Sequence, residues 1–165
     1  MARDNKRERS REIIKREFEQ KVVEIKRVTR VVAGGKRMRF RALVVIGDKK
    51  GKVGMGLRKG VDVAESVNKA VNAAKKNMIV VPLVGSTIPH IVKLKYKSSK
   101  IILLPAAPGT GIKAGGALRS VLDLAGVKDV LSKMIGSSNK VNNVKATFEA
   151  FKKMRTKEQL KAMRK

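Results

Sequence analysis

The segment Met38-Arg39-Phe40-Arg41-Ala42-Leu43-Val44-Val45-Ile46 decides the fold of the N-terminal half of this 165-residue chain. Charged and apolar side chains alternate at its start, so that Arg39 and Arg41 open one face. The other face carries only the apolar residues Met38, Phe40, Ala42, Val44 and Ile46. Alternation with a period of two is typical of a β-strand with one packed face. The segment therefore predicts a strand with one face for a core and one face that begins with two cations.

Two more strands are expected beside this one. Upstream, residues 22–32 are rich in β-branched side chains, and residues 33–37 (Ala-Gly-Gly-Lys-Arg) predict a hairpin link with two cations at its tip. Downstream, residues 47–51 predict a second turn and residues 52–57 a third strand. The N-terminal half is thus expected to hold three antiparallel strands.

A helix is expected to follow the third strand and to complete a unit over roughly residues 21–78. Asp62 and Glu65 fit a capping box in its looser form, with Asp at the cap. On the third strand, Gly54 and Gly56 share a face that lacks side chains, so a close approach of another group is expected there. The buried stripe of the helix is expected to consist of Val63, Val67, Ala70, Val71 and Ala74.

The second half reads as a separate α/β unit. Residues 90–97 alternate again, and the fully apolar residues 101–104 predict a central strand. A glycine-rich stretch, residues 108–116, opens a helix for which Gly126 is the expected stop. A short strand near residues 127–131, a loop over residues 136–139 and a last helix over about residues 142–154 complete this half. No internal repeat is present, and the tail from Thr156 predicts a short basic helix or a disordered segment.

Charge limits the class of partner. The chain has 40 Lys and Arg against 13 Asp and Glu, a formal net charge of +27. Such self-repulsion is relieved by a polyanion, and nucleic acid is the leading candidate because each neutralised phosphate releases a counterion. An anionic membrane surface is the alternative, but no apolar run approaches the ~18 residues of a spanning helix. With no cysteine and no apolar signal core at the N-terminus, a cytosolic protein is expected.

The cations of the N-terminal strands are the main candidates for an RNA surface. Residues 21–59 hold 13 basic residues, with Glu24 and Asp48 as the only acids. Alternation would give these strands one packed face and one cationic face, which suits contacts to a nucleic-acid backbone. Aromatic residues are only 3% of the chain, which disfavours stacking on single-stranded bases. Contacts to phosphates and 2′-hydroxyls of folded or duplex RNA are therefore expected.

Two features could instead support an enzyme. Gly109, Gly111 and Gly115 resemble a phosphate-binding loop before a helix, so a nucleotide-dependent small-molecule kinase is the rival function. A tight turn with close helix packing and a pocket for an RNA phosphate are the other interpretations of this loop. Their spacing is one residue too long for a dinucleotide fingerprint, and no Walker A sequence occurs. His90 is the only histidine, and with so few acids and no cysteine it predicts a structural role. We expect no catalytic residue, no metal site and no cofactor.

Several segments, in order and with family-like spacing from about residue 20 to 150, resemble the bacterial-type small-subunit ribosomal protein number five. In the first half these are Arg27-Val28-Thr29-Arg30-Val31-Val32-Ala33-Gly34-Gly35-Lys36-Arg37, the segment from Phe40 to Asp48, and Gly51-Lys52-Val53-Gly54-Met55-Gly56. In the second half they are Thr87-Ile88-Pro89-His90, Pro105-Ala106-Ala107, Gly109-Thr110-Gly111, Ala114-Gly115-Gly116 and Gly136-Ser137-Ser138-Asn139.

The resemblance implies an α+β protein of two domains. The first is a β3α domain like the double-stranded-RNA-binding fold without its usual first helix, and the second is an α/β domain with a left-handed β-α-β crossover. The expected boundaries are a basic arm over residues 1–20, the RNA-binding-like domain over 21–81, the α/β domain over 82–155, and a basic tail over 156–165. The second fold is shared with small-molecule kinases, which would account for the glycine loop.

The family resemblance also implies a function. Its members are not catalytic, bind small-subunit ribosomal RNA, support subunit assembly, and contact small-subunit proteins four and eight. They line the messenger RNA entry path in the cytoplasmic ribosome and influence translational accuracy. A double-stranded-RNA binder that acts off the ribosome is a second rival. The expected RNA-binding residues are Arg27, Arg30, Gly34, Gly35, Lys36, Arg37, Arg39, Arg41, Lys52, Gly54, Gly56 and Lys59, with the hairpin from Gly34 to Arg37 matching the family loop near the spectinomycin site. Ala33, Arg58 and Pro108 depart from the usual family pattern.

Overall fold

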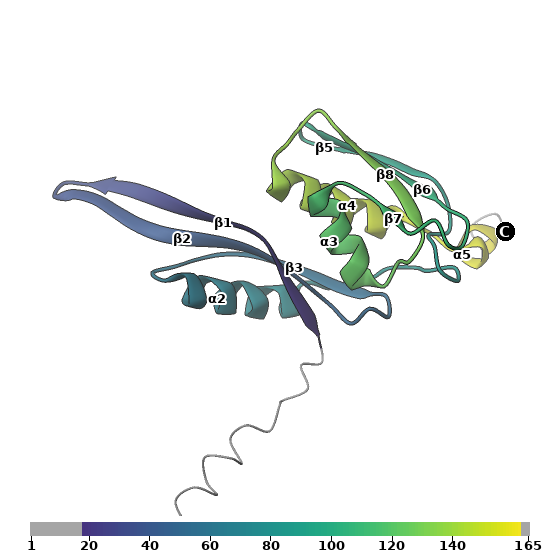
Figure 1. Cartoon of the computed structure of the whole chain (residues 1–165), viewed down its shortest axis with the longest axis horizontal. Coiled ribbons are helices and arrows are strands. Elements are labelled where there is room, and N and C mark those ends of the chain that lie inside the picture. The colour runs from purple at the N-terminus through teal and green to yellow at the C-terminus, as the bar shows by residue number, and fades with distance from the viewer. Residues whose placement is uncertain (1–17, 163–165) are drawn as a thin grey trace, which may run out of the picture.

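A computed structural model of the chain describes residues 18–162, apart from the side chains of residues 157, 158 and 160. It contains two four-stranded sheets, one in each half of the chain (Figure 1). Almost all of the arm predicted for residues 1–20 lies outside the described residues, as do the last three residues of the tail.

The N-terminal sheet is antiparallel, with its strands in the order of the sequence. It consists of β1 (Glu19–Val32), β2 (Gly35–Gly47), β3 (Lys52–Gly60) and β4 (Met78–Val80), and helix α2 (Val63–Lys76) covers one of its faces. The three predicted strands and the helix are confirmed. The fourth strand was not predicted, because its three residues carry no alternation and extend the sheet only by pairing with the first residues of β3.

Helix α2 lies so close to β3 that side chains on the facing strand residues are excluded. A Cβ atom at Gly54 would lie 2.5 Å from the Ala74 carbonyl oxygen, and one at Gly56 would collide with the Ala70 carbonyl. The helix begins as predicted: the Asp62 carboxylate accepts the Ala64 N–H, and Glu65 accepts the Val61 N–H at 2.7 Å. The close approach expected at these glycines is therefore that of the helix backbone.

The C-terminal sheet has the strand order β5-β6-β8-β7. Its elements are β5 (Val92–Tyr96), β6 (Ser99–Pro105), β7 (Ile112–Lys113), α3 (Gly116–Ala125), β8 (Val130–Ile135) and α4 (Lys140–Lys153), followed by the short helix α5 (Lys157–Ala162). The apolar run in β6 is central, as predicted. Strands β7 and β8 are parallel and joined through α3, which gives the expected β-α-β unit; its handedness stays a prediction.

The strand predicted near residues 127–131 begins later, at Val130. Gly126 ends α3 in the left-handed conformation, with φ of 84°, and Val127 donates its N–H back to the Leu122 carbonyl. Both Lys128 and Asp129 donate their N–H groups to the Ser86 carbonyl. These local bonds keep the first residues after α3 out of the sheet.

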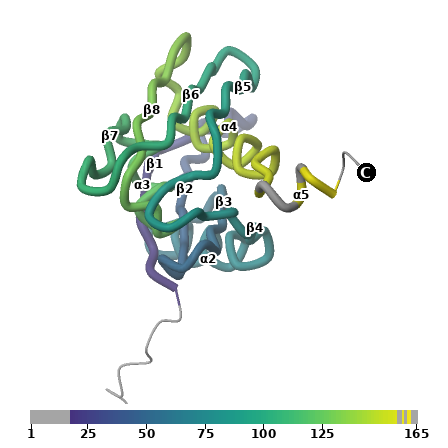
Figure 2. Tube along the Cα trace, turned by 90° about the vertical axis from the view of Figure 1, so that its right-hand side faces the viewer, coloured from purple at the N-terminus to yellow at the C-terminus, as the bar shows by residue number. Residues whose placement is uncertain are grey.

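The two halves share a core. Leu43 and Val45, on the face of β2 opposite α2, are buried in one cluster with Leu118 and Leu122 of α3. The turn after β2 also reaches the end of α3: Lys49 donates its N–H to the Leu124 carbonyl at 3.1 Å. The domains therefore lie against each other along α3, as the two views show (Figures 1 and 2). No helix within the described residues is long and apolar enough to span a membrane.

Candidate nucleic-acid interface

Strands β1 and β2 form a long hairpin that extends past α2, away from the C-terminal domain (Figure 1). Their pairing continues to Val32 and Gly35, so the turn itself has only two residues, Ala33 and Gly34. Gly35 has a φ of 130°, which a residue with a side chain rarely adopts. The link is thus shorter than predicted, and Lys36 and Arg37 belong to β2.

The register of the hairpin and β3 places six cations on one face, of which Lys26, the partner of Arg41, forms an ion pair with Glu24 and the other five form one set. Arg30 of β1 pairs with Arg37 of β2, and Arg41 of β2 pairs with Lys59 of β3. Residues that pair across antiparallel strands present their side chains on the same face, and alternate residues of a strand share a face. Arg39, between Arg37 and Arg41, completes the set. We call this surface the arginine face; it consists of Arg30, Arg37, Arg39, Arg41 and Lys59.

The arginine face contains a hollow of about 290 Å³ whose walls include Arg30, Arg37, Arg39 and Lys59. Val28 and Val32 also line it and were not among the predicted residues. The alternation of β1 could have identified them, because they have the same parity as Arg30. An apolar floor between cations allows contact with a ribose while the cations reach phosphates.

The other predicted residues lie elsewhere. Arg27 and Lys36 lie on the opposite face of the hairpin. Lys52 lies on β3, seven residues before Lys59, which corresponds to about 23 Å along a strand. Gly54 and Gly56 are buried under α2. The structure thus corrects the expectation for these two glycines, because the helix already occupies the space beside them.

The charge of the arginine face is not compensated within the described part of the chain. None of its five members forms an ion pair with residues 18–162, in contrast to neighbouring Lys26, which lies 3.4 Å from Glu24. No acid occurs between Glu24 and Asp48 in the sequence. The surface therefore retains a concentrated positive potential, which attracts a polyanion.

The glycine-rich loop already holds an anion of the protein itself. The buried Asp129 accepts the N–H groups of Gly109 and Gly111, each at 3.0 Å. Its pKa lies below the usual value, first because the Ser86 hydroxyl donates to it and then because Gly111 does. The backbone donors that a nucleotide phosphate would need at these two glycines are thus directed at Asp129, so the geometry offers the kinase hypothesis no support. Sequence reasoning missed Asp129, since no local pattern connects it to a loop about twenty residues upstream.

His90 has a structural position. Its Nε2 atom accepts the Arg155 N–H at 3.2 Å, and Nδ1 lies 2.9 Å from the Ile91 carbonyl oxygen, to which it then donates. The ring thereby fixes the chain just after α4. Among the described residues, no group of three or more His, Asp and Glu side chains is placed to hold a metal ion.

Comparison with protein families assigns both halves of the chain. Residues 18–82 match the family model of the ribosomal protein S5 N-terminal domain, and residues 94–164 match that of the ribosomal protein S5 C-terminal domain. The two matches occur in the order that the resemblance of the sequence segments implies, and they agree with the two-domain α+β architecture. The chain therefore belongs to the ribosomal protein S5 family and is a small-subunit ribosomal protein.

Proposed function

We propose that this protein is a structural, non-enzymatic component of the small ribosomal subunit that binds small-subunit ribosomal RNA through the β1–β2 hairpin. The observation that carries the proposal is the arginine face, where five cations lie together without an ion pair to any described residue. Family membership supports ribosomal RNA as the polyanion in question.

The proposed contacts are to the RNA backbone. The arginine face presents guanidinium groups, which bind phosphate oxygens in bidentate fashion, and it carries no aromatic side chain. Phe40 is half-buried and lies on the opposite face of β2. Recognition by shape, through phosphates and 2′-hydroxyls of folded RNA, fits such a surface better than base stacking. Gly34 and Gly35 allow the narrow tip to approach RNA closely, while Arg27, Lys36 and Lys52 would make separate contacts.

We further propose the finer roles that the family suggests. The protein would support subunit assembly, contact small-subunit proteins four and eight, line the messenger RNA entry path and influence translational accuracy in the cytoplasmic ribosome. The shared core supports such roles, because it holds the two domains together. RNA bound by the N-terminal domain would thereby fix where the surfaces of the C-terminal domain lie in the subunit.

Two double variants of equal charge on the same hairpin test the assignment. Arg37→Ala with Arg39→Ala removes two cations from the arginine face, whereas Arg27→Ala with Lys36→Ala removes two from the opposite face. The slope of log affinity for small-subunit ribosomal RNA against log salt should fall by roughly 0.7–0.9 for each phosphate that the variant no longer neutralises. We expect the slope to fall by about 1.4–1.8 for the first variant, and by less for the second.

The outcome is decided by the slopes measured for wild type and both variants over a salt titration. Equal slopes for wild type and the Arg37/Arg39 variant would show that the arginine face does not contact phosphates of the RNA. A generic A-form duplex serves as the competitor. If the duplex displaces ribosomal RNA at equal concentration, the protein is a general double-stranded-RNA binder and the ribosomal assignment of this surface fails.

A further inference from the structure

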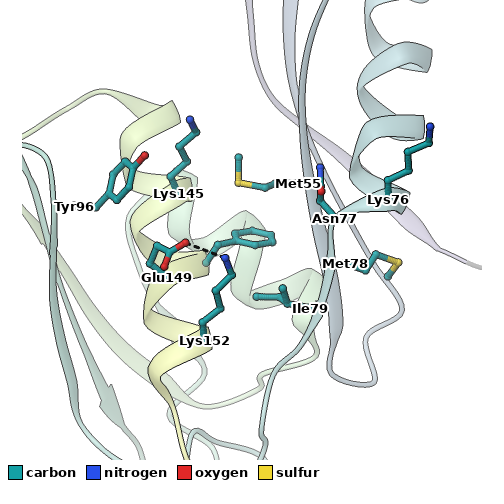
Figure 3. A pocket seen from close by; sticks show the side chains of 10 residues that line it. Met55, Lys76, Asn77, Met78, Ile79, Tyr96, Lys145, Glu149 and Lys152 are labelled. Carbon is teal, nitrogen blue, oxygen red and sulfur yellow. Dashed lines mark hydrogen bonds and ion pairs between the residues drawn. The ribbon is translucent and has the colours of Figure 1, made fainter.

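A cleft of about 510 Å³ lies between the end of α2 and helix α4 of the C-terminal domain (Figure 3). One wall comes from the end of α2, with Lys76 and Asn77, and the other from α4, with Lys145 and Lys152. Its size falls within the roughly 300–1,000 Å³ of ordinary ligand clefts. No function predicted from the sequence accounts for it.

The cleft is positively charged. Its one acid, Glu149, already accepts a hydrogen bond from Lys152 at 3.0 Å. Lys76 and Lys145 form no ion pair with any residue that the structure describes. Two lysine charges thus remain uncompensated in a concave site with an apolar floor, where an anion would be attracted more strongly than on a flat, solvated surface.

Lys145 is unusual among the lysines. Of those with a described side chain it alone is half-buried, while all the others are exposed. Cations at the C-terminal ends of helices are stabilised by the helix dipole, which suffices to account for Lys76 and Lys152. Lys145 lies in the second turn of α4, where the dipole does not favour a cation. The helix dipole therefore does not explain why a half-buried lysine lines the cleft at this position. An anionic ligand in the cleft would explain it.

The cationic surface continues beyond the cleft. A second hollow, of about 260 Å³, is lined by Arg58 of β3 and by Lys69, Asn72 and Lys76 of α2. Lys76 therefore borders both hollows. Arg58 also lacks an ion pair within residues 18–162, whereas Lys69 is 2.6 Å from Glu65. The two hollows share Lys76, and we call the surface from Arg58 over α2 to Lys145 the cleft track.

The shape of the track favours a chain of phosphates. Two aromatic residues line the cleft: Phe148 is only 5% exposed, and Tyr96 is half-buried and packs against the shared core, so neither ring is fully open for a base to stack on. A single acidic side chain of a protein would fill one hollow, but repeated negative charges are needed to occupy both. An RNA backbone supplies one phosphate per nucleotide, and Lys side chains bind phosphates as flexible point charges.

We propose that the cleft track is a second RNA-binding site, which holds the phosphate backbone of a small-subunit ribosomal RNA segment on Arg58, Lys76 and Lys145. This inference rests on the proposed function, since it requires that the protein binds ribosomal RNA. It adds a contact on the other side of α2 from the hairpin tip, and it places RNA against both domains at once.

Directed hydroxyl-radical cleavage tests this placement. The natural chain has no cysteine, so a single cysteine can carry an iron chelate at one chosen position and wild type is the negative control. Glu149→Cys places the chelate in the cleft and Met38→Cys places it on the hairpin. Each labelled protein is incorporated into reconstituted small subunits. We expect both to cut the ribosomal RNA, at different nucleotides.

The two positions separate the possible failures. Cleavage from the hairpin without cleavage from the cleft would overturn the cleft track and leave the proposed function intact. No cleavage from either position would overturn both. A protein partner in the cleft would give the first of these patterns, so it also counts against the inference.

The salt dependence of RNA affinity gives a second readout. Lys76→Gln with Lys145→Gln should lower the log–log salt slope for small-subunit ribosomal RNA by about 1.4–1.8. Lys95→Gln with Lys97→Gln, two exposed lysines outside both hollows, removes the same charge and should change the slope less. Equal changes for the two variants would show that the effect is one of net charge and would contradict a site at the cleft.

Discussion

Asp129 shows how a single side chain organises a loop that resembles a nucleotide site. The residue is only 5% exposed, and its carboxylate accepts hydrogen bonds from Gly109 and Gly111 on the incoming loop. The Ser86 hydroxyl and these N–H groups hold the pKa of Asp129 below its ordinary value. Backbone N–H groups stabilise the charged form of an acid when they point at it. The loop conformation and the ionised carboxylate therefore stabilise each other.

Replacing Asp129 with Asn should lower the melting temperature at neutral pH, since a neutral amide accepts these hydrogen bonds less strongly. The lowered pKa fixes the pH dependence. The stabilisation by the carboxylate is fully present above the unfolded-state pKa of about 4 and is lost as the pH falls through the lower folded-state pKa. Melting curves at several pH values should thus show a difference between wild type and variant that shrinks in acid.

Asp123→Asn is the matched control, because Asp123 faces Lys21 at 3.8 Å and both side chains are about half exposed. A smaller change in melting temperature is expected there. If Asp129→Asn melted like wild type at neutral pH, or if the difference persisted unchanged in strong acid, the proposed role of Asp129 would be wrong.

Gly56 illustrates a residue whose missing side chain is required. A Cβ atom there would collide with the Ala70 carbonyl of α2, so Gly56→Ala must push the helix from the sheet. Overpacking of this kind typically costs about 1–3 kcal/mol of the free energy of unfolding. Denaturant titration measures that cost. Gly34→Ala, at the hairpin turn where no other atom lies within 4 Å of a new Cβ, should be nearly neutral, and equal effects of the two changes would contradict the packing explanation.

Residues with local signals were predictable from the sequence, and residues with distant partners were not. Asp62 caps α2 and Gly126 ends α3 as their positions in the sequence indicate. The glycines of β3 indicated a close approach, but composition could not distinguish a helix from RNA as the approaching group. Asp129 and Lys145 acquire their surroundings only when elements far apart in the chain come together.

Strand β2 changes its environment along its length. Its first half belongs to the exposed hairpin, where alternation marks the arginine face. Its second half, residues 42–47, is completely buried, because α2 covers one face and the C-terminal domain covers the other. The sequence indicated one packed face and left the second open. The unbroken apolar run from Ala42 to Ile46 was the available signal, since such runs are typical of strands buried on both sides.

Leu43→Ala tests whether β2 couples the domains. Leu43 is 1% exposed and lies in the core that both domains share. Removing a buried leucine side chain typically costs about 2–5 kcal/mol. The only tyrosine, Tyr96, lies in β5, and the chain has no tryptophan, so tyrosine fluorescence reports the unfolding of the C-terminal domain. We expect a substitution in the N-terminal domain to lower the denaturant midpoint of that signal.

Val31→Ala serves as the control for this experiment. Val31 is 73% exposed near the tip of the hairpin, and its truncation should leave the tyrosine midpoint unchanged. If Leu43→Ala also left this midpoint unchanged while lowering the midpoint of far-ultraviolet circular dichroism, the domains would unfold independently and the shared core would not couple them.

At the scale of the whole molecule, the cations are arranged around α2. The N-terminal end of the helix lies beside Gly60, on the hairpin side, and its C-terminal end lies beside Gly54, at the cleft. Arg58 of the cleft track and Lys59 of the arginine face are consecutive residues of β3, so their side chains lie on opposite faces of the sheet and the two surfaces are separate. The sequence predicted the first surface because four of its five cations belong to one hairpin and the fifth, Lys59, to the strand that follows. It could not predict the second, because the cleft forms only where the end of α2 and helix α4 of the C-terminal domain come to line the same hollow.

Sedimentation of a cell lysate that contains the tagged protein, with and without a high-salt wash, tests whether the arginine face holds the protein on ribosomal RNA. Wild type should migrate with the small subunit and remain there after the wash. The variant with Arg37→Ala and Arg39→Ala should be released at lower salt, because fewer neutralised phosphates hold it. Wild type that stays at the top of the gradient, or a variant that resists the wash as well as wild type does, would contradict ribosomal RNA binding through the arginine face.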